Sequence, residues 1–117
     1  MRLPQRRQGV TVKLVHVLGN GENLSILITA NVDADNTVRE VFCANPMKGS
    51  DMDSMLTDGC ILISLLLQAG EPLAAVAAKM SELRPPGSDK GPPASVFGAI
   101  LNRLVVLQEE VARGEYT

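Results

Sequence analysis

A short polar segment, KGSDMD, lies between a predicted strand and a predicted helix and carries the residue types of an anion site. A lysine, a permissive glycine and a helix N-terminus can together bind a phosphate, because the helix end presents free backbone N–H groups and partial positive charge. Lys48, Gly49 and Ser50 are therefore candidate ligand-binding residues for phosphate or a nucleotide. Their order differs from the Walker pattern, in which serine or threonine directly follows the lysine.

The same segment also has a simpler interpretation as a helix cap. Ser50 or Asp51 can accept hydrogen bonds from free N–H groups of the first helical turn, and Asp53 adds a second negative charge there. These carboxylates would occupy the position of an anion or repel it. We therefore favour the cap, and a small-ligand site over residues 48–53 is the alternative.

The cysteines Cys43 and Cys60 and the histidine His16 match no metal-ligand spacing. Two cysteines also do not make a disulfide framework, and we expect both to be reduced and buried as small apolar side chains. Asp33 and Asp35 lie in a predicted turn that lacks the further acceptors of a calcium loop. We predict no catalytic residue, metal ligand or cofactor. An enzyme that uses Cys43 or Cys60 is the weakest of three hypotheses.

Short runs rich in β-branched residues predict three strands in the first part of the chain. These are Val10–Leu18, Leu24–Val32 and Thr37–Asn45. The connections between them are short turns, which favour an antiparallel meander. Residues 1–9 are expected to be a flexible N-terminal tail.

After Pro46 the hydrophobic period changes from that of a strand to that of a helix. The predicted helices are Asp51–Ala69, a second that begins at Pro72, and a third from about Pro93 to Arg113. This order predicts an α+β fold, in which a three-stranded antiparallel sheet is followed by three helices packed on one face. We expect residues 10–113 to form a single domain.

Two surfaces carry more apolar residues than a small monomer normally exposes. The helix Asp51–Ala69 is apolar nearly all round, which predicts burial on more than one side and places Leu66 in the core. The second face of the sheet is half apolar, with Val15, Val17, Leu27, Val41 and Cys43 expected there. Both surfaces predict self-association, and we expect a homodimer.

Charge and hydropathy argue against several classes of partner. A formal net charge of -2 gives no overall field that attracts nucleic acid or an anionic membrane. The apolar run CILISLLLQAG is too short to cross a bilayer, and MRLPQRRQGV has no apolar signal-peptide core after it. We therefore expect a cytoplasmic protein without nucleic-acid or membrane partners.

Two segments together resemble a known family. The first, TVREVFCANPMKGSDMDSM, is a strand with Glu-Val-Phe followed by a Lys-Gly-Ser turn into a helix. The second, CILISLLLQAGEPLAAVAAKMSEL, combines an apolar helix, a glycine stop and a Pro-Leu restart. With GPPASVFGAILNRL they make the chain similar to the TSCPD domain from about Gly9 to Leu107. That domain is a C-terminal appendage of cobalamin-dependent (class II) ribonucleotide reductases and also occurs as small free-standing proteins.

The resemblance implies a non-catalytic accessory or interaction module associated with deoxyribonucleotide synthesis, with ribonucleotide reductase as a partner. Pro93–Phe97 stands where the family carries its Thr-Ser-Cys-Pro-Asp signature, and the signature cysteine is absent. The resemblance therefore implies no cysteine or metal chemistry here. Radical reduction needs a thiyl cysteine, a reducing cysteine pair and a large barrel that holds cobalamin, for which 117 residues leave no room. The chain alone is not expected to be a reductase.

Overall fold

The first part of the chain folds into a sheet because β-branched residues alternate along it. The computed structural model describes residues 8–18, 20–44 and 51–115, so most of the predicted tail lies outside them. The strands are β1 (Gln8–Val17), β2 (Asn23–Val32) and β3 (Val38–Ala44), antiparallel in the order β1-β2-β3. The central strand β2 buries every second residue: Leu24, Ile26, Ile28, Ala30 and Val32. The predicted meander is confirmed.

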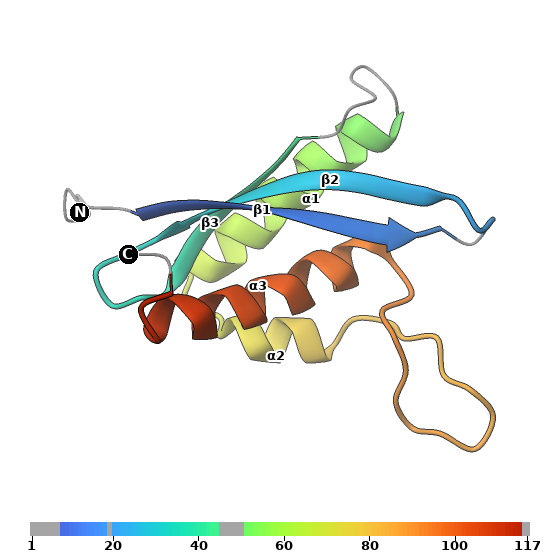
Figure 1. The fold of residues 1–117 in the computed structure, drawn as a ribbon. Coiled ribbons are helices and arrows are strands. Elements are labelled where there is room, and N and C mark those ends of the chain that lie inside the picture. The colour runs from blue at the N-terminus through green and yellow to red at the C-terminus, as the bar shows by residue number, and fades with distance from the viewer. Residues whose placement is uncertain (1–7, 19, 45–50, 116–117) are drawn as a thin grey trace.

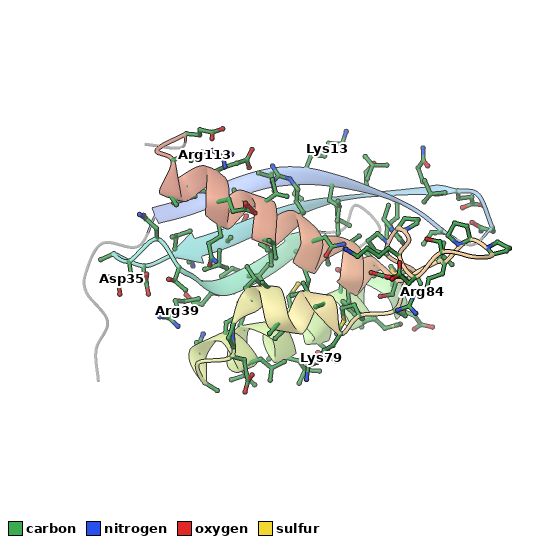
Figure 2. All side chains as sticks on the ribbon, turned by 90° about the horizontal axis from the view of Figure 1, so that it is seen from below. Lys13, Asp35, Arg39, Lys79, Arg84 and Arg113 are labelled. Carbon is green, nitrogen blue, oxygen red and sulfur yellow. The ribbon has the colours of Figure 1, made fainter. Side chains whose placement is uncertain are left out.

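One carboxylate organises the turn between β2 and β3. Oδ1 of Asp33 accepts hydrogen bonds from the backbone N–H groups of Asp35 at 2.8 Å and Thr37 at 3.1 Å. Its Oδ2 pairs with Nε of Arg39 at 2.7 Å. Figure 2 shows Asp35 and Arg39 at the same end of the molecule. Asn36 adopts a left-handed φ of 61°, which asparagine tolerates better than most residues.

Three helices follow the sheet, with ends set by local capping. They are α1 (Asp51–Gln68), α2 (Leu73–Ala78) and α3 (Val96–Ala112). Gly70 ends α1 with a φ of 97°, a conformation that costs glycine little. Pro72 precedes α2, and Oγ of Ser95 accepts the N–H of Gly98 at 3.2 Å as the N-cap of α3.

The helices gather on one side of the sheet, which confirms the predicted α+β fold (Figure 1). α3 lies across the inner faces of β1 and β2, α2 packs on α3, and α1 runs beside β3. The core lies between the sheet and α3, and its largest fully buried side chains include Ile26, Ile28, Ile100, Leu101, Leu104 and Leu107. Gly59 of α1 lets Phe97 of α3 pack closely, because a Cβ there would overlap the ring. Burial of the apolar core side chains between the sheet and α3 removes their surface from water, which drives folding.

α1 also covers the outer edge of β3 (Figure 1). Oγ of Ser64 accepts the N–H of Val41 at 2.9 Å and donates to its carbonyl at 3.3 Å. One helical turn later, Nε2 of Gln68 donates to the carbonyl of Arg39 at 3.3 Å. Two strand residues span about 6.6 Å and four helical residues about 6 Å. Every fourth residue of α1 therefore lies opposite every second residue of the antiparallel strand β3. Side chains of α1 thereby satisfy backbone groups that a free edge strand leaves open.

The predicted burial of α1 on more than one side is wrong. Only one stripe of the helix is buried, and it consists of Leu56, Cys60, Ile63 and Leu67. Leu66 is 44% exposed and lies outside the core. Hydrophobicity alone does not show whether the partner of an apolar surface belongs to the same chain.

The predicted orientation of β3 is wrong as well. Val41 pairs with Ala30 and Cys43 with Ile28, so both face the helices and not the open face of the sheet. The pairing shifts between Asn31 and Val32, whose partners are Glu40 and Val38. The extra residue is a bulge, which reverses the alternation that a strict period of two predicts.

Candidate functional site

The predicted ligand-binding residues Lys48, Gly49 and Ser50 lie outside the described residues, so the anion-site hypothesis stays a prediction. Asp51 and Asp53 of the same segment lie in the first turn of α1. Negative charge at this position stabilises the N-terminal end of a helix and would repel a phosphate.

The structure brings together two residues that the sequence analysis treated separately, Cys43 of β3 and Cys60 of α1. Their Sγ atoms lie 2.6 Å apart, and both cysteines are free thiols. Cys60 is 3% exposed, whereas Cys43 is only half-buried. The expectation of a buried cysteine therefore holds for Cys60 and fails for Cys43.

The contact between Cys43 and Cys60 continues the row of contacts between α1 and the edge of β3, called here the edge pairing. Cys60 precedes Ser64 by one helical turn, and Cys43 follows Val41 by two strand residues. The two Ser64–Val41 hydrogen bonds therefore hold the sulfur atoms in register. The only sequence signal is the matched spacing of residues 60, 64 and 68 in the helix and 43, 41 and 39 in the strand, which becomes informative once α1 is known to lie antiparallel to β3.

A hydrogen bond between the two thiols moves their pKa values in opposite directions. It raises the pKa of Cys43, and burial raises it further. The same hydrogen bond lowers the pKa of Cys60, against the effect of burial. The pair therefore titrates as a unit in which Cys60 loses its proton before Cys43 does.

A hollow of about 250 Å³ opens beside the two thiols. It is lined by Val41, Phe42, Cys43, Thr57, Cys60 and Ile61. Phe42 and Ile61 are both 53% exposed, so the hollow meets the solvent between β3 and α1. A small molecule can therefore approach the sulfur of Cys43.

Two apolar surfaces lie away from the core. The first, called here the α1 outer face, consists of Met55, Ile61, Leu62, Leu65 and Leu66, which are 44–63% exposed. The second is the open face of the sheet, with Val15, Val17, Leu27 and Phe42. Contiguous apolar surface of this kind marks sites of protein contact more often than isolated exposed residues do.

A second hollow of about 770 Å³ lies between the end of β1, α3 and the loop before α3. Its lining is mostly apolar and includes three polar side chains, His16, Asn102 and Arg103. Arg103 pairs with Glu110 at 3.1 Å. His16 thus lines a different hollow from the two cysteines, in keeping with its distance from them in the sequence.

Within residues 8–18, 20–44 and 51–115, no group of three or more His, Cys, Asp or Glu side chains could hold a metal ion. None of the helices in this part of the chain combines the length and the apolar composition of a membrane span.

Comparison with known proteins identifies a family and a curated relative. The family model of the TSCPD domain matches residues 3–107. A vitamin B12-dependent ribonucleotide reductase from Streptomyces clavuligerus is 30% identical over 105 residues, which cover 88% of this chain and 10% of the reductase. The chain thus spans about a tenth of the length of that relative. No solved structure matches.

Proposed function

Because the chain belongs to the TSCPD domain family, we propose that it is a non-catalytic accessory module of deoxyribonucleotide synthesis that acts through protein contacts. The family resemblance seen in the sequence is confirmed by the match over residues 3–107. The similarity to part of a vitamin B12-dependent ribonucleotide reductase supports the proposed pathway. A reductase of that type is the proposed partner.

The α1 outer face is the observation that carries the proposed contact function. Met55, Leu62 and Leu66 follow one another at intervals of seven and four residues, the spacing of a helix-pairing seam. Covering such side chains removes apolar area from water at about 25 cal/mol per Å².

We propose that a second copy of the chain covers this face. A two-fold axis presents the same apolar seam from both copies, so one self-complementary surface is enough for a homodimer. We further propose a cytoplasmic location without nucleic-acid or membrane partners, in keeping with the net charge of -2.

Light scattering coupled to gel filtration tests the dimer with the variant Leu62→Glu/Leu65→Glu. Wild type is expected to be dimeric at micromolar concentration. The variant is expected to be monomeric with an unchanged circular dichroism spectrum, because both side chains are exposed in the monomer. The matched control is Val15→Glu/Leu27→Glu on the open face of the sheet, which should stay dimeric. A monomeric wild type contradicts the dimer, and a dimeric α1 variant contradicts the assignment of the interface to the α1 outer face.

Binding to a purified vitamin B12-dependent ribonucleotide reductase tests the pathway assignment. The chain is expected to bind the reductase in biolayer interferometry and to form no deoxyribonucleotide by itself. Absence of binding at high micromolar concentration, for wild type and the monomeric variant alike, contradicts the accessory role. Deoxyribonucleotide formation by the purified chain contradicts its non-catalytic character.

A further inference from the structure

We propose that Cys43 and Cys60 form a reversible dithiol–disulfide site that exchanges with the disulfides of small thiols. The proposal is independent of the accessory role. It rests on the 2.6 Å separation of the two sulfur atoms, on the open hollow beside Cys43, and on the hydrogen bonds that hold α1 against β3.

The position of the two sulfur atoms favours a bond within one chain. An S–S bond is about 2.05 Å long, so the sulfurs need little movement to form it. Two hydrogen bonds between Ser64 and the backbone of Val41, next to the cysteine contact, hold α1 against β3. Oxidation can therefore proceed without a rearrangement of β3 or α1.

The difference in exposure assigns a role to each thiol. Cys43 is half-buried and lines the hollow, so its sulfur is the one that an external disulfide reaches. Cys60 is 3% exposed and meets Cys43 from the inner side. Cys43 is accordingly the exchange thiol, and Cys60 is the resolving thiol.

The exchange takes place in two balanced steps. In the first, the Cys60 thiolate takes the proton of Cys43 as the Cys43 sulfur attacks one sulfur of a disulfide RS–SR, so that a Cys43–SR bond forms, the RS–SR bond breaks, and RS⁻ leaves and takes up a proton from the solvent. In the second, the Cys60 thiolate attacks the sulfur of Cys43 and expels the second RS⁻, which takes up the proton of Cys60. The external disulfide is reduced to two RSH, and the protein dithiol is oxidised to one intramolecular disulfide.

Reduction follows the same path in reverse. An external thiolate attacks the accessible sulfur of Cys43, and Cys60 leaves as the thiolate. The lowered pKa of Cys60 makes it a good leaving group, since a thiol with a lower pKa leaves faster. The site is therefore suited to reversible exchange and not to permanent crosslinking.

The experiment incubates folded wild-type protein with a series of glutathione mixtures, from fully reduced to fully oxidised, and quenches with acid. Intact-mass measurement and maleimide labelling then count the free thiols. Oxidised wild type should be lighter by two hydrogens, unlabelled by maleimide and monomeric on a non-reducing denaturing gel. Excess reduced glutathione should restore both thiols. The oxidised form should melt several degrees higher, because the disulfide bond lowers the conformational entropy of the unfolded chain.

Two variants distinguish the roles of the thiols. Cys60→Ala should accumulate a mixed disulfide of Cys43 with glutathione, because the resolving thiol is missing. Cys43→Ala should remain unmodified, because Cys60 is buried. The wild-type measurements decide the question even if a variant does not fold. Two free thiols in a large excess of oxidised glutathione, a glutathione adduct as the end product, or a bond between two chains would each overturn the proposal.

Discussion

The side chain of Asp33 is 10% exposed and joins a turn, a strand and an arginine. Burial pushes the pKa of Asp33 up, but hydrogen bonds from Arg39 and from the backbone of Thr37 and Asp35 more than offset this, and the pKa lies below its ordinary value. The folded state therefore favours the ionised carboxylate. Its contribution to stability is complete above the unfolded pKa of about 3.9 and is lost as the pH falls through the lower folded pKa.

Asp33→Asn is expected to lower the free energy of unfolding at pH 7 by about 1.5–3 kcal/mol, the usual contribution of hydrogen bonds to a charged group. Asparagine keeps one acceptor for the backbone but presents an NH₂ group to Arg39. Urea unfolding at pH 7 and pH 3 measures the effect, and the loss should shrink at the lower pH. Asp35→Asn is the control, at an exposed position of the same turn. An equal loss at both pH values would show that the ion pair does not contribute.

Lys48 belongs to the alternative hypothesis of a nucleotide or phosphate site. We expect millimolar dATP to leave the melting temperature of wild type and of Lys48→Ala unchanged, because Asp51 and Asp53 already place negative charge in the first turn of α1. The control is Lys13→Ala, at an exposed strand position. A dATP-dependent rise in wild type and Lys13→Ala that is missing in Lys48→Ala would establish the anion site, since a ligand stabilises only the protein that binds it.

At the scale of elements, the two hydrophobic periods predict all six helices and strands of the described residues and most of their ends to within a few positions. The strand order follows from the short turns, and Gly70 and Pro72 mark the end of α1 and the start of α2. These signals are local, because they depend on neighbours a few residues apart. The orientation of β3 was missed because a bulge changes the pairing by one residue and leaves the composition unchanged.

The contact between Cys43 and Cys60 could not be obtained from local pattern. It depends on how α1 is turned about its own axis and which strand edge it approaches. Those properties follow from the packing of Leu56, Ile63 and Leu67 into the core. Once α1 is known to lie antiparallel to β3, the spacing of Ser64 and Gln68 explains the contact.

The two sides of α1 predict opposite effects for neighbouring residues. Leu67 is 2% exposed, so Leu67→Asp places a charge in the core at a cost of several kcal/mol, comparable with the stability of the whole domain. Leu66 is 44% exposed, and Leu66→Asp should change the stability of the monomer by less than about 0.5 kcal/mol. Circular dichroism should show an unfolded Leu67→Asp and a folded Leu66→Asp. The reverse result would mean that the helix is rotated about its axis.

At the scale of the whole molecule, the helices cover one face of the sheet (Figure 1). Apolar side chains remain exposed on two other surfaces, the α1 outer face and the open face of the sheet. The matched part of the curated relative is about a tenth of its length, so in that protein the equivalent domain is joined to a much larger chain. In the proposed dimer, a second copy of this chain covers the α1 outer face.

The edge pairing between α1 and β3 has a kinetic consequence. The amide proton of Val41 is bonded to the hydroxyl of Ser64 and not to a neighbouring strand. Its replacement by solvent deuterium therefore requires the release of α1 from the sheet edge and does not require the sheet itself to open. That single amide reports how often the helix detaches, separately from global unfolding. A bond between Cys43 and Cys60, one step away on the same edge, would slow its exchange.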